Sequence, residues 1–217
     1  MLFHDRREAG RELADRLIER RSEGALADPF VLALPRGGVP IGDEIARALG
    51  APLDVVVARK IGAPFNPEVG VGALAGEGPP LYDERALAML DLTADRLSPV
   101  VARERAEMHR REDLYRGGRP APEVKGRTAV VVDDGLATGV TARAALRAVR
   151  AMEPGRLVLA VPVGSPEAAE ALAAEADAVV CPHRPQPFYA VGQWYEEFDQ
   201  VGDDEVIAIL RGHPGGR

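Results

Sequence analysis

Short apolar runs alternate with stretches of helical spacing along much of the chain, most regularly in its second half. Apolar runs at residues 129–132, 157–161 and 178–181 are separated by amphipathic stretches at 140–152 and 166–174. Buried parallel strands are nearly continuous apolar runs, and the helices that connect them cover the faces of the sheet. The pattern predicts an α/β fold with a mostly parallel, twisted sheet, right-handed crossovers and flanking helices.

The first half follows the same alternation less strictly. Four elements are expected from its apolar spacing: a helix at 5–21, a strand at 30–34, a helix at 39–49 and a buried strand at 53–58. Residues 61–80 are rich in glycine and proline. We interpret this stretch as a mobile arm with a strand pair around residues 69–74.

Two regions are additions to this plan. Helices expected at 84–90 and 94–115 make residues 76–124 a helical insertion, and we interpret the alternating charges of the longer helix as a solvated face. The aromatic-rich segment 182–217 is expected to cap one end of the sheet. A length of 217 residues suits a single domain, which we place at residues 1–217 with both additions included.

The composition argues against several classes of protein. A net charge of −7 opposes a general interaction with nucleic acid or with an acidic membrane surface. The sequence has no apolar run of about 18 residues, the length that a membrane-spanning helix needs, and its first residues lack the apolar core of a secretory signal. We therefore expect a water-soluble, cytoplasmic protein without nucleic-acid or membrane partners.

The use of particular residue types adds three expectations. Arginine supplies nearly all of the basic side chains, proline is abundant and asparagine is scarce, which is thermophile-like but also typical of a GC-rich genome. The single cysteine, Cys181, lies in an apolar run and is interpreted as an unreactive core thiol. The histidines lack the spacing of zinc ligands, so no structural zinc site is expected.

One segment carries the strongest chemical signal. After the apolar run at 129–132 come two carboxylates and a turn of small and hydroxyl residues that opens a helix: Asp133, Asp134, Gly135, Leu136, Ala137, Thr138, Gly139, Val140 and Thr141. Backbone N–H groups and threonine hydroxyls at a helix N-terminus suit a phosphate. Paired carboxylates at a strand end suit ribose hydroxyls or a bound Mg²⁺. The alternative is that the acids only cap the helix and the glycine only makes the turn.

Taken in this order, the segment resembles the 5-phosphoribosyl-1-pyrophosphate (PRPP) signature of type I phosphoribosyltransferases. Two further segments support this resemblance, which covers residues 30–165. The run Leu34-Pro35-Arg36-Gly37-Gly38 is similar to the family's pyrophosphate loop, and a non-proline cis peptide bond is expected next to Arg36. The run Ala58-Arg59-Lys60-Ile61-Gly62 is similar to the basic segment before the flexible catalytic loop of adenine phosphoribosyltransferases.

The resemblance implies the type I phosphoribosyltransferase fold and a reaction. In that reaction the 5-phosphoribosyl group passes from PRPP to a nitrogenous acceptor, and pyrophosphate leaves with Mg²⁺ neutralising its charge. The residues assigned to catalysis are Arg36, Lys60, Asp133 and Asp134. Those assigned to PRPP binding are Arg36, Gly37, Gly38, Arg59, Lys60, Asp133, Asp134, Ala137, Thr138, Gly139, Val140 and Thr141. Asp133 and Asp134 would meet Mg²⁺ only indirectly, through PRPP.

Alternatives stay open for the roles of Arg59 and Lys60 and for the function of the protein. Neighbouring strand residues point in opposite directions, so Arg59 and Lys60 can instead be ordinary surface charges. The second function considered is a non-catalytic protein that senses PRPP or a nucleotide, and the presence of Arg36 beside the Arg59-Lys60 pair favours catalysis over it. A serine hydrolase is disfavoured because Gly164-Ser165-Pro166 lacks the Gly-x-Ser-x-Gly elbow.

A nucleobase is the favoured acceptor, although the motifs do not name one. Enzymes for 6-oxopurines usually have Asp at the position of Ala137, and uracil enzymes usually have Asp-Pro in place of Asp133-Asp134, so the motif is closest to the adenine type. The aromatic candidates for stacking on a planar acceptor, with core packing as the alternative, are Phe188, Tyr189, Trp194 and Tyr195. A homodimer is compatible with the resemblance, and the sequence itself specifies no oligomeric state.

Overall fold

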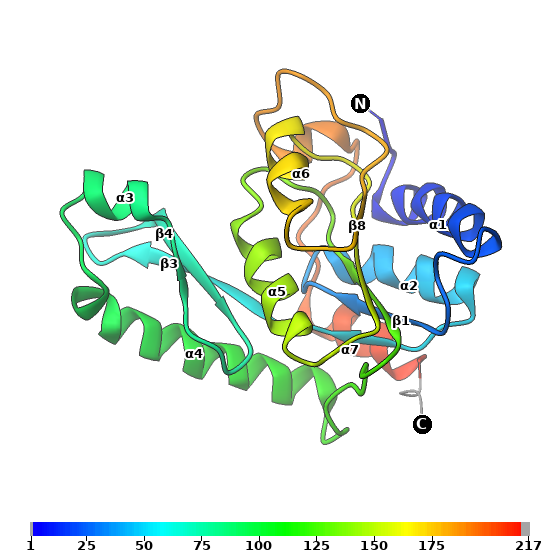
Figure 1. Ribbon diagram of the computed structural model, residues 1–217, viewed down its shortest axis with the longest axis horizontal. Coiled ribbons are helices and arrows are strands. Elements are labelled where there is room, and N and C mark those ends of the chain that lie inside the picture. Colours follow the sequence, from blue (N-terminus) through cyan, green and yellow to red (C-terminus); the bar gives the residue numbers. More distant parts are fainter. Residues whose placement is uncertain (1, 214–217) are drawn as a thin grey trace.

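A sheet of five parallel strands is the centre of the computed structural model, which describes residues 2–213 (Figure 1). The strands are β1 (Pro29–Ala33), β2 (Leu53–Val55), β6 (Thr128–Val132), β7 (Arg156–Ala160) and β8 (Ala178–Val180). Their order across the sheet is β2-β1-β6-β7-β8, and every neighbouring pair is parallel. The predicted α/β fold with a parallel sheet is confirmed.

Helices cover both faces of this sheet. They are α1 (Arg6–Ser22) and α2 (Gly38–Leu49) on one face, and α5 (Val140–Arg150) and α6 (Pro166–Leu172) on the other. Alternate strand residues join opposite apolar clusters: Val31 and Val130 pack with α1 and α2, whereas Leu32 and Val131 pack with α5 and α6. Burial of both faces explains why these strands are continuous apolar runs.

A second, antiparallel sheet projects from the first. Its strands and the helices that follow are β3 (Ala58–Ala63), β4 (Asn66–Ala75), β5 (Leu81–Tyr82), α3 (Glu84–Met89) and α4 (Ala94–Arg116). We call these five elements, which include residues 61–80, the arm. In Figure 1 its strands and α3 lie to the left of α5, and α4 runs from there below α5. The strand pair expected around residues 69–74 is present and longer than expected. Ile61, Val71, Leu74 and Leu97 are fully buried within the arm.

One predicted strand is wrong at its end. The sequence pattern favoured a single strand over residues 53–58, but β2 ends at Val55. The chain then leaves the main sheet, and Ala58 pairs with Ala75 of β4 in the second sheet. An apolar run does not reveal a change of partner, because both sheets bury the same kinds of side chain.

The interpretation of the α4 charges as a solvated face is also wrong for part of the helix. Glu104 binds the Arg59 side chain of β3, with Nη2 and Nε at 2.6 Å and 3.0 Å from the same carboxylate oxygen. Arg105 donates hydrogen bonds to the carbonyl oxygens of Gly76 and Gly78. These charges attach α4 to the strands and the turn of the arm.

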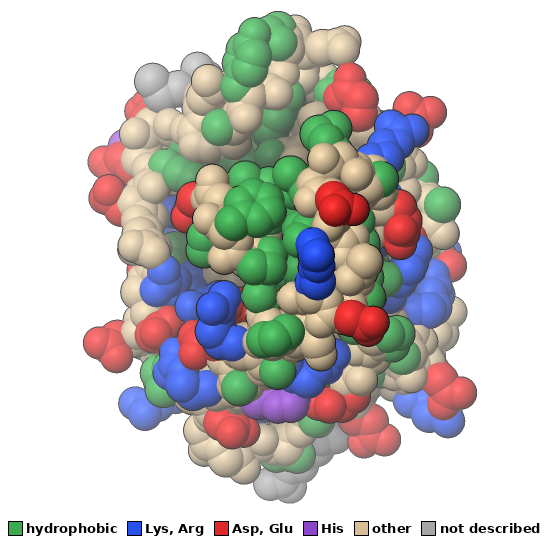
Figure 2. All heavy atoms as spheres, turned by 90° about the vertical axis from the view of Figure 1, so that its left-hand side faces the viewer, with side chains coloured by type: hydrophobic (Ala, Val, Ile, Leu, Met, Phe, Trp, Pro, Cys, Tyr) green, Lys and Arg blue, Asp and Glu red, His purple; other side chains and the backbone are tan. Residues whose placement is uncertain are grey.

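The outer face of the arm is partly apolar. In Figure 2, which views the molecule from the arm side, hydrophobic side chains gather near the middle of the face and charged side chains lie mostly around them. Phe65, in the turn between β3 and β4, and Met89, at the end of α3, are both exposed.

The C-terminal segment packs against the N-terminus and the α1–α2 face of the sheet. It contains the 3₁₀ helix η1 (Val191–Trp194) and α7 (Asp203–Arg211), which the sequence pattern did not reveal. The backbone N–H groups of Leu2 and Phe3 both donate to the Trp194 carbonyl at 3.0 Å. Within residues 2–213, no helix combines the length and the apolar character needed to cross a membrane.

Candidate functional site

Two loops that follow neighbouring strands meet at the carboxyl end of the sheet. The glycine loop, residues 34–38, follows β1, and the signature loop, residues 133–141, follows β6. The Leu34 N–H donates to the Val132 carbonyl at 2.8 Å, which continues the strand pairing into the loops. A Cβ added at Gly37 would overlap the Asp134 carboxylate, and one at Gly38 would lie 2.6 Å from the Val132 carbonyl oxygen. Only glycine lets these loops approach so closely.

The acid pair lies in a region where charge is costly. Burial raises the pKa of Asp133 well above its ordinary value, and the adjacent charge of Asp134 raises it further. Burial also raises the pKa of Asp134, while the guanidinium of Arg6 acts in the opposite direction. The pair is therefore poised to gain from any ligand that brings hydrogen-bond donors or positive charge.

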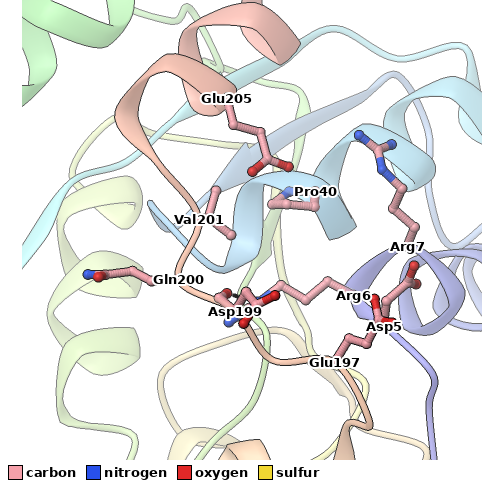
Figure 3. A pocket seen from close by; sticks show the side chains of 9 residues that line it. All are labelled: Asp5, Arg6, Arg7, Pro40, Glu197, Asp199, Gln200, Val201 and Glu205. Carbon is pink, nitrogen blue, oxygen red and sulfur yellow. Dashed lines mark hydrogen bonds between the residues drawn. The ribbon is translucent and has the colours of Figure 1, made fainter.

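Arg6 is the site residue that sequence reasoning missed. Its Nε donates to Asp134 Oδ2 at 2.9 Å, its Nη1 donates to the Asp199 carbonyl at 2.8 Å, and its guanidinium lies 3.9 Å from the centre of the Phe198 ring. Figure 3 shows Arg6 reaching from α1 toward Asp199, and both residues line a small cavity of about 170 Å³. No local pattern distinguishes it from the other arginines of α1, because its partners are distant in sequence.

The signature loop is fixed by the loop after β7. The Leu136 N–H donates to the Val163 carbonyl at 3.0 Å, and the Ser165 N–H donates back to the Leu136 carbonyl at 2.8 Å. The Ser165 hydroxyl donates to the Ala137 carbonyl at 3.0 Å and also accepts a bond at the N-terminus of α6. These bonds give Ser165 a structural task, in keeping with the absence of a hydrolase elbow.

The tip of the signature loop is open to solvent. Ala137 and Thr138 are exposed, and Thr141 is half-buried in the first turn of α5. Gly139, the N-cap residue of α5, has φ +72°, a left-handed conformation that glycine adopts without strain. The N–H groups of the first helical turn have no intrahelical partner, so this end of α5 has the geometry of an anion site.

Arg36 precedes Gly37 on the glycine loop. The Pro35–Arg36 peptide bond is cis, as expected next to this residue. The Arg36 Nη1 is 3.7 Å from Asp203 Oδ1, which also accepts a 2.6 Å hydrogen bond from the Tyr115 hydroxyl. Burial and this acceptor raise the pKa of Tyr115 to about 12. Arg36 is thus held toward α7 and α4.

Arg59 and Lys60 are not brought to the two loops. They belong to β3 and point in opposite directions, as neighbouring strand residues do. Arg59 is paired with Glu104 of α4, and Lys60 lies across Gly70 and donates to the Glu68 carbonyl at 3.0 Å. Both side chains are engaged within the arm.

The C-terminal aromatics have different surroundings. Tyr195 is 3% exposed, stacks on Phe198 with ring centres 5.0 Å apart, and donates its hydroxyl to the Asp134 carbonyl at 2.7 Å. Phe188 stacks on Trp194 at 6.0 Å. Tyr189 is exposed. Tyr195 is therefore packed in the core, and its hydroxyl binds the backbone of the signature loop.

The side chains suit Mg²⁺ only as part of a larger donor set. Asp133 and Asp134 supply the hard oxygen atoms that Mg²⁺ prefers. Within residues 2–213, no group of three or more histidine, cysteine, aspartate or glutamate side chains could hold a metal ion alone.

Cys181 is buried and its Sγ lies 3.3 Å from the His183 carbonyl; burial raises the pKa of this thiol.

Comparison with known proteins places the chain in a family. The family model of the phosphoribosyl transferase domain matches residues 4–205. Two Mycobacterium tuberculosis proteins, from strains CDC 1551 and H37Rv, are provisionally named phosphoribosyl transferases and are 44% identical over 209 residues. The match covers 96% of this chain and 46% of each relative, so the chain spans about half the length of the curated relatives it matches.

A solved structure is similar over the whole chain. The crystal structure of TT1426 from Thermus thermophilus is 46% identical and has a TM-score of 0.81, over 99% of this chain and 100% of that one. The family model, these relatives and the parallel sheet with its acid pair agree. The chain belongs to the phosphoribosyl transferase family.

Proposed function

We propose that this chain transfers the 5-phosphoribosyl group of PRPP to a nitrogen atom of a small acceptor, with a nucleobase as the favoured class, and releases pyrophosphate. The observation that carries the proposal is the contact between the glycine loop and the acid pair. Residues 34–38 and 133–141 are distant in sequence, yet they meet at the carboxyl end of neighbouring strands, beside the N-terminus of α5. Ligands of open parallel sheets bind at this position.

Each part of the contact region has a task in this proposal. Residues 137–141 bind the 5-phosphate through backbone N–H groups and threonine hydroxyls, because the N-terminus of α5 favours negative charge. Asp133 and Asp134 accept hydrogen bonds from the ribose hydroxyls. The Gly37 N–H group and the Arg36 side chain bind the pyrophosphate, which must carry away the negative charge as its bond to the sugar breaks. Gly38, whose N–H donates to the Leu34 carbonyl at 3.0 Å, contributes by keeping the loop close to β6.

Mg²⁺ would bind chiefly through oxygen atoms of PRPP, with Asp133 and Asp134 indirect partners. When bound, it would neutralise charge on the leaving pyrophosphate. The protein's own contribution is to orient the sugar with fixed donors and acceptors and to limit the access of water, which competes with the acceptor.

Arg59 and Lys60 enter the proposal only if the arm rearranges. Lys60 must leave the Glu68 carbonyl, and Arg59 must leave Glu104, before either side chain can meet pyrophosphate. This engagement of both cations is the specific observation that favours the second candidate, a non-catalytic protein that binds PRPP or a nucleotide. Such a protein needs the signature loop and no cation at the leaving group.

Calorimetry separates these functions. Titration of PRPP with Mg²⁺ into the wild type should show binding, and the Asp133→Asn/Asp134→Asn variant should lose it, while Asp15→Asn, on the exposed face of α1, should bind as the wild type does. A screen of nucleobases and amines for pyrophosphate release then tests catalysis. Release with one acceptor identifies the enzyme, and binding without release supports the sensor. No binding of PRPP by the wild type refutes the transferase and a sensor of PRPP.

A further inference from the structure

A second cavity lies away from the two loops, between the arm and the main sheet. It has a volume of about 570 Å³ and is enclosed by the end of β4 and the turn after it, α4, α5 and the carboxyl end of β2. Its walls are mostly apolar, and they include Val56, Leu81, Ala148, Ala151 and Met152. None of the residues that we assign to PRPP lines it. We call it the arm cleft.

Four charged side chains line the arm cleft, and two of them have close partners outside it. At its rim, Glu77 is 2.8 Å from His109, and Arg147 is 2.7 Å from Glu175. These pairs leave Glu112 and Arg116 of α4 as the polar groups that characterise the cleft.

Glu112 is incompletely paired. Its side chain is 18% exposed, and the nearest cation, Nη1 of Arg116, is 3.9 Å from its carboxylate, beyond hydrogen-bonding distance. Burial raises the pKa of Glu112, and the charge of Arg116 acts only in part against it.

Arg116 is shared with other acceptors. Its Nε is 3.6 Å from Asp54 Oδ1 and its Nη2 donates to the Val55 carbonyl, so this one cation faces two carboxylates. The carboxylates of Glu112 and Asp54 therefore share one cation, Arg116, which makes a hydrogen bond with neither of them in the part of the chain that the structure describes.

We propose that the arm cleft is a second ligand site, which takes a small, mostly apolar molecule carrying an amino group that donates to Glu112. The apolar walls gain from covering the body of such a molecule. The amine supplies the donors that Glu112 lacks, and in a cleft of low polarity such a charge-assisted hydrogen bond is stronger than in water. A ligand with a carboxylate in place of the amine meets repulsion from Glu112.

Tryptamine is a suitable probe, and indole-3-propionate carries the same ring with the opposite charge. Calorimetry on the whole chain should give tryptamine a Kd of about 1 mM, the range expected for a ligand with so few atoms, and should show at least about tenfold weaker binding of indole-3-propionate. Glu112→Gln should weaken tryptamine binding about tenfold. Asp133→Asn/Asp134→Asn should leave it unchanged, because the acid pair lies outside the cleft.

A steric variant makes the test independent of charge. Ala151 is exposed and lines the cleft, so Ala151→Phe should fill the mouth without disturbing the core and abolish tryptamine binding. Ala171→Phe, on the exposed face of α6, is the matched control and should bind normally. Absence of tryptamine binding by the wild type, or binding that survives Ala151→Phe, overturns the proposal. So does a wild-type dimer that Ala151→Phe dissociates, since the occupant would then be a second copy.

Discussion

The Asp134 carboxylate packs directly against the backbone of Gly37 and occupies the space that a Cβ at residue 37 would need. The same is true to a smaller degree at Gly38, where the backbone of residue 132 is the neighbour. At the scale of the residue, the candidate site thus depends on the absence of a side chain at Gly37 and at Gly38. The ionisation of Asp133 and Asp134 depends in turn on their surroundings, because burial makes both carboxyl groups costly to ionise.

Replacement of Gly37 by alanine should displace the Asp134 carboxylate and weaken PRPP binding at least about tenfold, or about 1.4 kcal/mol. Calorimetry with PRPP and Mg²⁺ measures this effect. Gly78→Ala is the control, because a Cβ at Gly78 meets no atom within 4 Å. Unchanged affinity in Gly37→Ala would mean that the acid pair does not contribute to binding.

Asp133→Asn should stabilise the ligand-free protein. Because the folded state raises the pKa of Asp133, the free energy of unfolding falls as pH rises from about 4, the ordinary carboxyl pKa, through the raised value. Asparagine removes this loss. We expect the melting temperature at neutral pH to rise by about 2–4 °C, for a gain of about 1 kcal/mol.

The pH dependence supplies the check on this prediction. Below about pH 4, where Asp133 is protonated in both states, the variant and the wild type should melt together. Asp15→Asn, at an exposed position of α1, should match the wild type at every pH. A melting temperature that falls in Asp133→Asn at neutral pH would contradict the burial argument.

At the scale of the element, α4 is attached to β3 by one partly buried ion pair. The side chains of Arg59 and Glu104 are 25% and 12% exposed, so water screens their interaction only in part. A double-mutant cycle with Arg59→Met and Glu104→Gln should give a coupling free energy of about 1 kcal/mol in urea unfolding. The exposed pair Lys125–Glu153 should show no measurable coupling in the same experiment; equal coupling in both pairs would refute the role of burial.

The elements also show why part of the structure could be predicted from sequence and part could not. The strands of the main sheet and the signature loop have local patterns, and residues 129–141 lie where those patterns placed them. The end of β2 and the pairing of Arg59 depend on which sheet the chain joins, which no local pattern specifies. Arg6 is 128 residues from Asp134, and only the packing of α1 brings them together.

At the scale of the whole molecule, both ends of the chain support the site. Arg6, near the N-terminus, and Tyr195, in the C-terminal segment, each bind Asp134, one through its carboxylate and the other through its carbonyl oxygen. Phe3 packs on Tyr195 with ring centres 5.4 Å apart, so the two ends also contact each other. The signature loop is therefore held by residues from across the fold.

Tyr195→Ala should lower the free energy of unfolding by about 3 kcal/mol, because it removes a buried aromatic ring, and Tyr195→Phe should lower it by about 1 kcal/mol through loss of one hydrogen bond. Urea unfolding measures both. Tyr189 is 76% exposed, so Tyr189→Ala should change stability little. Equal effects of Tyr195→Phe and Tyr195→Ala would show that the ring itself contributes nothing.

The sheet order β2-β1-β6-β7-β8 has a consequence for the order in which the chain folds during its synthesis. β1 is made early in synthesis, but its neighbour β6 follows only after β2 and the whole arm, whose strands pair locally. Contacts between segments so far apart close late, since the chain between them must first give up its freedom. The ribosome therefore releases an arm that can already be paired while the acid pair has not yet met the glycine loop. The candidate site therefore forms only near the end of folding, after the arm has paired.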